Sequence, residues 1–249
     1  MKNVVLRTNA IPVYGFLSVI TARQSDEGGS APRSILDCGA GGPVPPLALF
    51  HQHGFQGWGI DTSQEQLDRA EQFCEEHGIE LHLRIGDMRS IPFEDGTFDH
   101  VYEHYSMCHL SKADTALAVS EMHRVLKRGG LGFLGVISDD TWPRSLFGKE
   151  QEPGEYWRDG VEGAEGELTL HSMFNDLEAD ELVSAWEIVS KEKQVRYLRE
   201  AAEDMMLDEW MELHGEAEDG CSLEEWRARY EGRANAIQYT HVYFFLRKP

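Results

Sequence analysis

Ser34-Ile35-Leu36-Asp37-Cys38-Gly39-Ala40-Gly41-Gly42-Pro43 is the stretch that decides the architecture of this chain. The short apolar run before Asp37 predicts a buried strand, because it stops at a Gly-rich break. The glycines allow a sharp turn in which a ligand can lie against the backbone. Pro43 suits the first turn of a helix, where its missing N–H is not needed. A strand, a turn and a helix with a carboxylate at the strand end form a crevice that typically binds a nucleotide-like ligand.

The glycine spacing separates two kinds of nucleotide site. The dinucleotide fingerprint Gly-x-Gly-x-x-Gly, counted from Gly39, has its third position at Val44, so the match is incomplete. Asp37 stands beside the turn, where an acid suits a cationic amino group better than a pyrophosphate. The pattern Leu36-Asp37-x-Gly39-x-Gly41 resembles motif I of class I S-adenosylmethionine (SAM) methyltransferases, with Pro43 in place of the usual third glycine. The alternative is a generic Gly-rich turn that binds no ligand.

A second acid follows at the end of the next predicted strand, Gly57 to Asp61. A carboxylate at this distance from the glycine turn can accept hydrogen bonds from both ribose hydroxyls of an adenosine. NAD enzymes use the same arrangement, so Asp61 indicates a ribose rather than one cofactor. The alternative is an N-cap for the following helix, a role that Thr62 or Ser63 also suits.

A third acid, Asp87, follows the predicted strand Leu81 to Ile85. The resemblance implies that Asp87 binds the adenine amino group and that the backbone N–H of Met88 meets the adenine ring. A plain turn carboxylate is the alternative. The resemblance as a whole implies the following cofactor-binding residues: Asp37, Gly39, Ala40, Gly41, Asp61, Thr62, Gln66, Asp87, Met88, Arg89 and Glu103.

Proton-accepting side chains gather after the predicted fourth strand, Phe98 to Tyr102. The preceding segment, Ile91 to Asp99, is similar to the one before strand four in the same family. The resemblance places the meeting point of substrate and methyl donor just beyond this strand. His104, Tyr105 and His109 are therefore the candidate catalytic residues, as general bases for an oxygen or nitrogen nucleophile. Loop histidines also commonly hydrogen-bond the backbone, which is the alternative, and no metal is expected because the His and Cys spacing here matches no zinc pattern.

The later periodicities continue the alternation of strands and helices. Helices are expected at Leu47 to His53, starting near Pro43, at Ser63 to His77, at Ser111 to Leu126 and up to about Ala185; strands are expected at Leu131 to Ile137, Trp186 to Arg196 and Tyr239 to Arg247. The predicted fold class is therefore α/β, with a Rossmann-like, seven-stranded sheet and helices on both faces. The resemblance implies that the sheet is mostly parallel and that its last strand is antiparallel.

The chain is expected to form a single domain over residues 1–249. Residues 1–33 are predicted to form an N-terminal helix and linker, and the resemblance makes Tyr14 a candidate cofactor contact. Asp139 to Gly166 shows no clear periodicity and is interpreted as a long loop, which in compact domains is typically a lid or a binding loop. Residues 139–170 and 198–236 are predicted to be insertions that form a lid or substrate cap over the active site.

Composition restricts the possible partners. The net charge of −21 argues against nucleic acid and anionic membranes, since both need clustered Lys and Arg. The four cysteines show no CxxC or disulfide-like spacing, which favours reduced thiols and a cytoplasmic location. No apolar run approaches the length of a membrane span, and Arg7, Thr8 and Asn9 interrupt any signal-like core. The oligomeric state stays open.

The order of the motifs is more informative than any single motif. From about residue 34 to 137 they follow the order of the small-molecule branch that includes ubiquinone and menaquinone methyltransferases. The working hypothesis is transfer of a methyl group from SAM to an unidentified small molecule, with the cofactor supplying the activated methyl. The alternatives are an NAD(P)-dependent oxidoreductase on the same architecture and a SAM-binding protein without turnover.

Overall fold

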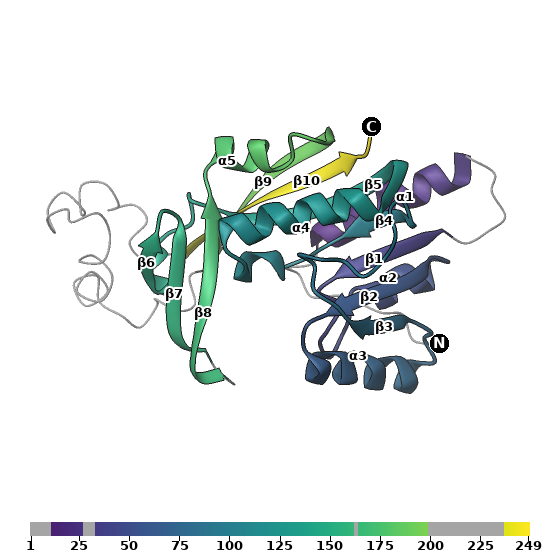
Figure 1. The fold of residues 1–249 in the computed structure, drawn as a ribbon, viewed down its shortest axis with the longest axis horizontal. Helices are drawn as coiled ribbons and strands as arrows, with labels where there is room; N and C mark the ends of the chain where they lie inside the picture. Colours follow the sequence, from purple (N-terminus) through teal and green to yellow (C-terminus); the bar gives the residue numbers. More distant parts are fainter. Residues whose placement is uncertain (1–10, 27–32, 162–163, 199–236) are drawn as a thin grey trace, which may run out of the picture.

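The computed structural model describes residues 11–26, 33–161, 164–198 and 237–249. Its centre is a seven-stranded sheet in the order β3-β2-β1-β4-β5-β10-β9 (Figure 1). Strands β1 to β5 are parallel, and β10 is antiparallel to both β5 and β9. The strands span Ser34–Cys38 (β1), Gln56–Asp61 (β2), His82–Ile85 (β3), Phe98–Tyr102 (β4), Leu126–Ser138 (β5), Glu187–Leu198 (β9) and Ile237–Arg247 (β10). The predicted fold class is confirmed.

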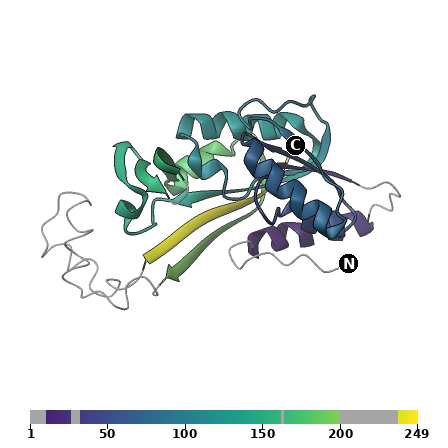
Figure 2. The same cartoon turned by 90° about the horizontal axis from the view of Figure 1, so that it is seen from below.

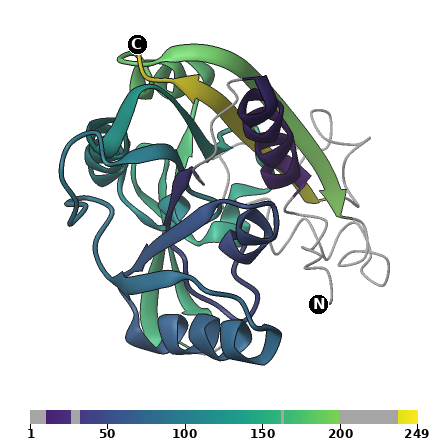
Figure 3. The ribbon, with the colours of Figure 1, turned by 90° about the vertical axis from the view of Figure 1, so that its right-hand side faces the viewer.

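Helices cover both faces of this sheet (Figures 1 and 3). Helices α4 (Lys112–Val125) and α5 (Asp176–Leu182) pack on one face, and α1 (Ile11–Asp26), α2 (Leu47–Gln52) and α3 (Gln64–His77) pack on the other. Figure 2 shows β9 and β10 running side by side away from the helices. This arrangement leaves the carboxyl ends of β1, β2 and β4 at one edge of the molecule, where the loops that bear the predicted site residues begin.

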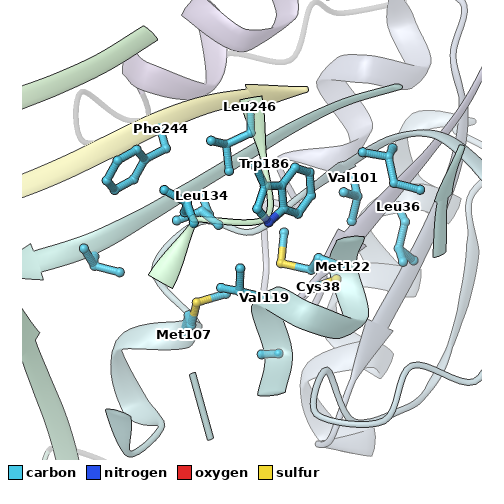
Figure 4. Close-up of a cluster of buried hydrophobic side chains, with 14 of the residues drawn as sticks. Leu36, Cys38, Val101, Met107, Val119, Met122, Leu134, Trp186, Phe244 and Leu246 are labelled. Atoms are coloured by element: carbon cyan, nitrogen blue, oxygen red, sulfur yellow. The ribbon is translucent and has the colours of Figure 1, made fainter. Parts of the chain in front are cut away.

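The two faces are built from alternate residues of the same strands. On β10, Phe244 packs toward α4 and Phe245 toward α1, because successive strand residues point to opposite faces. Figure 4 shows the α4 side, where Trp186 and Met122 meet Leu134 of β5. Burial of a side chain of this size stabilises the fold by about 1.5–3 kcal/mol. The apolar residues that alternate along the strands are therefore also the main source of stability.

Three further strands occupy the segment that we interpreted as a loop, and that interpretation is wrong. Strands β6 (Lys149–Glu152), β7 (Glu155–Val161) and β8 (Ala164–Phe174) are antiparallel neighbours, and β8 joins the end of β5 through the pairs Ile137↔Met173 and Ser138↔Phe174 (Figure 1). Apart from the contact with β5, these strands pair with one another, and most of their residues lie outside the core. Their sequences therefore needed little hydrophobic alternation. The sequence between residues 139 and 166 therefore lacks the hydrophobic alternation from which we predicted the other strands.

The start of helix α2 is a second correction. Pro43 lies outside the helix, which begins at Leu47 with Pro46 in the N-cap position. A residue before proline is pushed away from the α conformation, and the prolines at 45 and 46 extend this restriction beyond Pro43. The helix therefore cannot begin before the last proline of the series.

The starts of helices α3 and α4 follow their expected capping residues. Ser63 accepts a hydrogen bond from the Gln66 N–H, and Ser111 accepts one from the Asp114 N–H. Asn175 and Glu178 form a capping box at α5. The predicted insertion at 198–236 lies almost wholly outside the described residues, as does the linker that ends the 1–33 segment.

Candidate functional site

A cavity of about 900 Å³ opens at the carboxyl ends of β1, β2 and β4. Its floor comes from the turn after β1 and the end of β2, and its walls come from the loops after β3 and β4. Most of the predicted site residues line it: Gly39, Asp61, Thr62, Gln66, Asp87, Met88, Arg89, Tyr105 and His109. The sequence-based assignment thus collects residues from four separate loops around one space. Their individual roles stay predictions.

The glycine turn is closely packed against its surroundings. Gly39 has φ +108°, and any side chain there would overlap the Ser106 hydroxyl. A Cβ at Gly41 would lie 2.6 Å from the Asp61 Oδ2 atom. The backbone N–H groups of Gly39 and Ala40 donate to the Ile60 carbonyl, which ties the turn to β2. Only glycine fits at 39 and 41, and the absence of side chains leaves the Asp61 carboxylate open toward the cavity.

Asp61 is held in a fixed orientation by the backbone. Its Oδ2 accepts the Gly41 N–H at 3.0 Å and its Oδ1 accepts the Ser63 N–H at 2.9 Å. Each carboxylate oxygen has a second lone pair, so both can still accept a hydrogen bond from a ligand. A cavity-lining carboxylate fixed in this way suits a vicinal diol, as the sequence predicts for a ribose.

Asp87 and Arg89 form an ion pair at the mouth of the cavity. The Arg89 Nη2 lies 2.6 Å from the Asp87 Oδ2, and its Nη1 lies 3.2 Å from the Asp114 Oδ2. Hydrogen bonds from the Arg89 side chain hold the pKa of Asp87 below its usual value. A ligand amino group must therefore share the Asp87 carboxylate with Arg89. Asp114, from the first turn of α4, is a cavity residue that the sequence analysis did not select.

Four of the predicted cofactor residues do not line the cavity, namely Asp37, Ala40, Gly41 and Glu103, and the two carboxylates among them are buried. Asp37 is 2% exposed and accepts a hydrogen bond from the Tyr102 hydroxyl, and burial raises its pKa to about 8. Glu103 is fully buried and accepts the N–H groups of Met107 at 3.1 Å and Gly135 at 2.8 Å. Burial raises the pKa of Glu103, and the backbone donors oppose this rise. Both carboxylates therefore hold the strand ends and loops that shape the site, and neither lines the cavity.

Tyr105 adopts the left-handed backbone conformation, with φ +65°. This region is unfavourable for a residue with a bulky side chain, and such strain often occurs at functional positions. The Tyr105 ring borders the cavity, and its hydroxyl lies 3.2 Å from that of Tyr243 on β10. The strained backbone therefore turns the ring from the end of β4 toward the last strand of the sheet.

His109 is exposed and bonds the backbone, as the alternative interpretation of loop histidines allows. Its Nδ1 lies 3.0 Å from the Leu170 carbonyl oxygen of β8. Because a carbonyl only accepts, Nδ1 carries the proton and Nε2 is left as the basic nitrogen of the neutral ring. Its ring centroid is 4.8 Å from that of His171, whose pKa burial lowers to about 4. His109 therefore keeps a basic nitrogen at the cavity wall.

His104 and Tyr14 lie away from the cavity. The His104 ring meets the edge of Tyr105, with a centroid distance of 4.4 Å, and its side chain does not line the cavity. Tyr14 packs against the α1 side of the core, beside Phe16 and its neighbours. The structure thus brings Tyr105 and His109 together with the predicted cofactor residues, while His104 stands behind Tyr105.

The strands of the 139–170 segment supply one wall of the cavity. Trp157 of β7 and Thr169 and Leu170 of β8 face it. We placed this segment over the active site from topology, but we selected none of its residues. Trp157 offered a signal, as a large aromatic residue in a segment rich in Gly, Asp and Glu, although its partner strand could not be recognised from sequence. The position of this wall supports the lid hypothesis, which stays a prediction.

The residues present fit SAM as a ligand. The glycine turn leaves a cradle that any side chain would fill, and a carboxylate with spare lone pairs borders it. Asp87 and the backbone of Met88 lie at the next loop of the same cavity. Within residues 11–26, 33–161, 164–198 and 237–249, no group of three or more His, Cys, Asp or Glu side chains is arranged to hold a metal ion. In the same described part of the chain, no helix has the length and apolar character needed to span a membrane.

Comparisons with known proteins agree with this geometry. Residues 35–130 match the profile of the family described as "Methyltransferase domain". The chain is 36% identical over 101 residues to the uncharacterized methyltransferase YcgJ of Bacillus subtilis, an alignment that covers 40% of this chain and 39% of YcgJ. It is 32% identical over 102 residues to sterol 24-C-methyltransferase of Pneumocystis carinii, covering 39% of this chain and 26% of that enzyme. The chain thus aligns with less than half the length of these relatives.

The structural comparison extends the similarity beyond the aligned segment. A SAM-dependent methyltransferase from Methanosarcina mazei superposes with a TM-score of 0.62 at 17% identity, covering 90% of this chain and 96% of that protein. At this identity the likeness concerns the fold alone. The protein has the Rossmann-like α/β fold of methyltransferases, and its residues 35–130, which hold the glycine turn, Asp61 and Asp87, are similar in sequence to a methyltransferase domain.

Proposed function

We propose that this protein is a SAM-dependent methyltransferase that acts on a small-molecule acceptor. The observation that carries the proposal is the cavity at the carboxyl ends of β1, β2 and β4, which combines a side-chain-free glycine turn with the fixed Asp61 carboxylate. The similarity of residues 35–130 to methyltransferase domains gives independent support.

Each group of the site has a distinct part in binding. Asp61 accepts the ribose hydroxyls, and the Asp87 carboxylate with the Met88 backbone binds the adenine. The turn at Gly39 and Gly41 receives the methionine portion. When bound, the cofactor supplies an activated methyl group. The protein orients the acceptor and excludes water, which together account for much of the rate enhancement of such a transfer.

A general base has one well-placed candidate. His109 lines the cavity and keeps Nε2 free of its backbone bond, so it can take a proton from an oxygen or nitrogen nucleophile. Tyr105 lines the same cavity from the same loop after β4 and orients the acceptor through its ring. His104 does not line the cavity and contacts Tyr105.

The acceptor is proposed to be a small, largely apolar molecule. One relative is named for a sterol, and the motif order resembles the ubiquinone and menaquinone branch. The β6–β8 segment caps the acceptor, as the Trp157 and Leu170 contacts with the cavity suggest. We also propose a cytoplasmic location, because the spacing of the four cysteines favours reduced thiols.

The proposal is tested by measuring S-adenosylhomocysteine (SAH) formation from SAM with panels of neutral aromatic and aliphatic acceptors. Acceptor-dependent SAH formation supports the methyltransferase. Binding of SAM without product from any acceptor would favour a non-catalytic SAM-binding protein. Binding of NADH in place of SAM would favour the oxidoreductase alternative.

A further inference from the structure

The Arg89 side chain occupies the Asp87 carboxylate at the mouth of the cavity. The Asp87 Oδ1 atom accepts the backbone N–H of Arg89 at 2.8 Å and its Nε–H at 3.0 Å. The Asp87 Oδ2 atom accepts the same Nε–H at 3.0 Å and the Nη2 group at 2.6 Å. A carboxylate offers about four lone-pair sites, shared between its two oxygens. Arg89 therefore fills the acceptor capacity of Asp87, mostly through its side chain.

A ligand amino group can bond Asp87 only in exchange for this guanidinium. Both residues line the cavity, so a ligand meets the pair from that side. The Arg89 hydrogen bonds lower the pKa of Asp87, which keeps the carboxylate anionic at neutral pH and attractive to either donor. Departure of the side chain would leave the backbone N–H of Arg89 on Oδ1 and free the Oδ2 atom. The guanidinium and an amino group thus compete for the same oxygen atoms.

Asp114 offers the guanidinium a second acceptor on the wall of the same cavity. Its Oδ2 atom lies 3.2 Å from Arg89 Nη1, which is longer than the 2.6 Å contact between Arg89 Nη2 and Asp87. Asp114 belongs to the first turn of α4, and its backbone N–H donates to the Ser111 hydroxyl at 3.0 Å. The Arg89 side chain is 43% exposed, and exposed ion pairs are weak, so it can exchange one carboxylate for the other at little cost.

We propose that Arg89 is an internal competitor of the adenine amino group, and that Asp114 is the positioning residue that holds Arg89 when the cofactor takes its place on Asp87. This inference rests on the proposed methyltransferase function, in which Asp87 binds adenine, and it adds what sets the affinity and selectivity of that contact. A purine with an amino donor replaces the hydrogen bonds that Asp87 loses from the guanidinium. A purine with an oxo group at the same position cannot replace them and leaves Arg89 on Asp87.

The test uses calorimetric titration of the full chain with SAH and with S-inosylhomocysteine, which has an oxo group in place of the adenine amino group. The unchanged protein should bind SAH more tightly of the two. Arg89→Met removes the guanidinium and keeps an unbranched side chain. Because an exposed ion pair no longer has to be broken, this variant should bind SAH about two- to fivefold more tightly than the unchanged protein does. Its affinity for S-inosylhomocysteine should not rise.

Variants of Asp114 test whether it acts through Arg89. Asp114→Asn removes the charged acceptor of Nη1 and should weaken SAH binding by about two- to fivefold, because Arg89 then stays on Asp87. Asp114→Glu keeps the carboxylate and should retain most of the affinity. In the Arg89→Met protein, Asp114→Asn should leave SAH binding unchanged, since no guanidinium remains to be held. A purely structural effect of Asp114 on the start of α4 would instead be the same in both backgrounds.

Two matched controls remove the same charges outside the cavity lining. Arg69→Met on α3 breaks an exposed ion pair of similar length, in which Arg69 Nη2 lies 2.6 Å from the Glu65 carboxylate. Asp180→Asn on α5 breaks the 2.6 Å pair with Lys191. Both controls should bind SAH and S-inosylhomocysteine as the unchanged protein does. An equal gain of SAH affinity in Arg69→Met and Arg89→Met would show a general effect of charge and would overturn the inference.

The outcomes separate this inference from the function on which it rests. An Arg89→Met protein with unchanged or lower SAH affinity would overturn the competition, and so would an equal gain for S-inosylhomocysteine. Equal affinities of the two ligands for the unchanged protein would overturn it without any variant. A loss in Asp114→Asn that persists in the Arg89→Met background would overturn the role of Asp114. Failure of SAH itself to bind the unchanged protein would instead contradict the proposed methyltransferase.

Discussion

Replacing Asp61 by alanine should weaken SAH binding strongly. The carboxylate accepts the Gly41 N–H at 3.0 Å and the Ser63 N–H at 2.9 Å, which orients both oxygens and leaves each a lone pair for a ribose hydroxyl. A hydrogen bond to a charged acceptor contributes about 1.5–3 kcal/mol. Asp61 is half-buried, so competition with water places the loss of two such bonds at about 2–3 kcal/mol. The dissociation constant should then rise by about 30- to 150-fold.

The same substitution should also loosen the glycine turn. Two backbone donors lose their acceptor, which should lower the free energy of unfolding by about 1–3 kcal/mol. Asp61→Asn keeps one acceptor oxygen and should fall between alanine and the unchanged protein in both measurements. The matched control is Asp68→Ala on α3, which removes the same charge from an exposed carboxylate that accepts a hydrogen bond from the Gln64 side chain.

The assay is calorimetric titration with SAH, with urea unfolding of each variant beside it. The Asp68→Ala protein should bind SAH with unchanged affinity. A folded Asp61→Ala protein that binds SAH as well as the control would refute the ribose assignment, whatever its stability. An equal loss of SAH affinity in Asp61→Ala and Asp68→Ala would show a general effect of the removed charge instead of a contact with the ribose.

Further predictions concern stability. Burial raises the pKa of Asp37 from 3.8 to about 8, so as the pH rises the unfolded chain releases this proton before the folded protein does. The free energy of unfolding should therefore fall as the pH rises from about 4 to about 8. Asp37→Asn should flatten that part of the pH profile in urea titrations, and an unchanged profile would contradict the burial argument. Tyr105→Gly should be more stable than Tyr105→Ala by about 1 kcal/mol, because glycine adopts φ +65° freely, and equal midpoints of thermal unfolding would speak against strain. Met122→Ala, which opens a cavity between α4 and the sheet, should lower the free energy of unfolding by about 2–5 kcal/mol, and a loss under 1 kcal/mol would contradict its place in the core.

The sequence predicted those parts of the fold that carry a local signal. The helices that start after Ser63 and Ser111 have a capping residue and an amphipathic stripe, and their observed starts agree with these signals. Strands β1 and β4 of the central sheet are largely buried on both faces, so their apolar runs stand out. Strands β6 to β8 were missed because many of their residues are polar and show no clear hydrophobic alternation, although each strand pairs with its neighbour in the sequence. Pro43 was misplaced because its own suitability for a helix start was weighed without the prolines at 45 and 46.

In the candidate site, too, the sequence predicted the residues that carry a local signal and missed those that do not. Asp61 and Asp87 were selected because each ends a predicted strand, and both line the cavity. Glu103 was selected on the same basis but is buried against backbone donors, a difference in side-chain direction that position in sequence does not contain.

The measurement that tests the central claim most directly is calorimetric titration of the purified protein with SAM, SAH and NADH. The cavity geometry predicts that SAM and SAH bind to one site per chain and that NADH does not bind. Binding of NADH alone, or of none of the three, would contradict the assignment of the glycine turn and Asp61 to a SAM site.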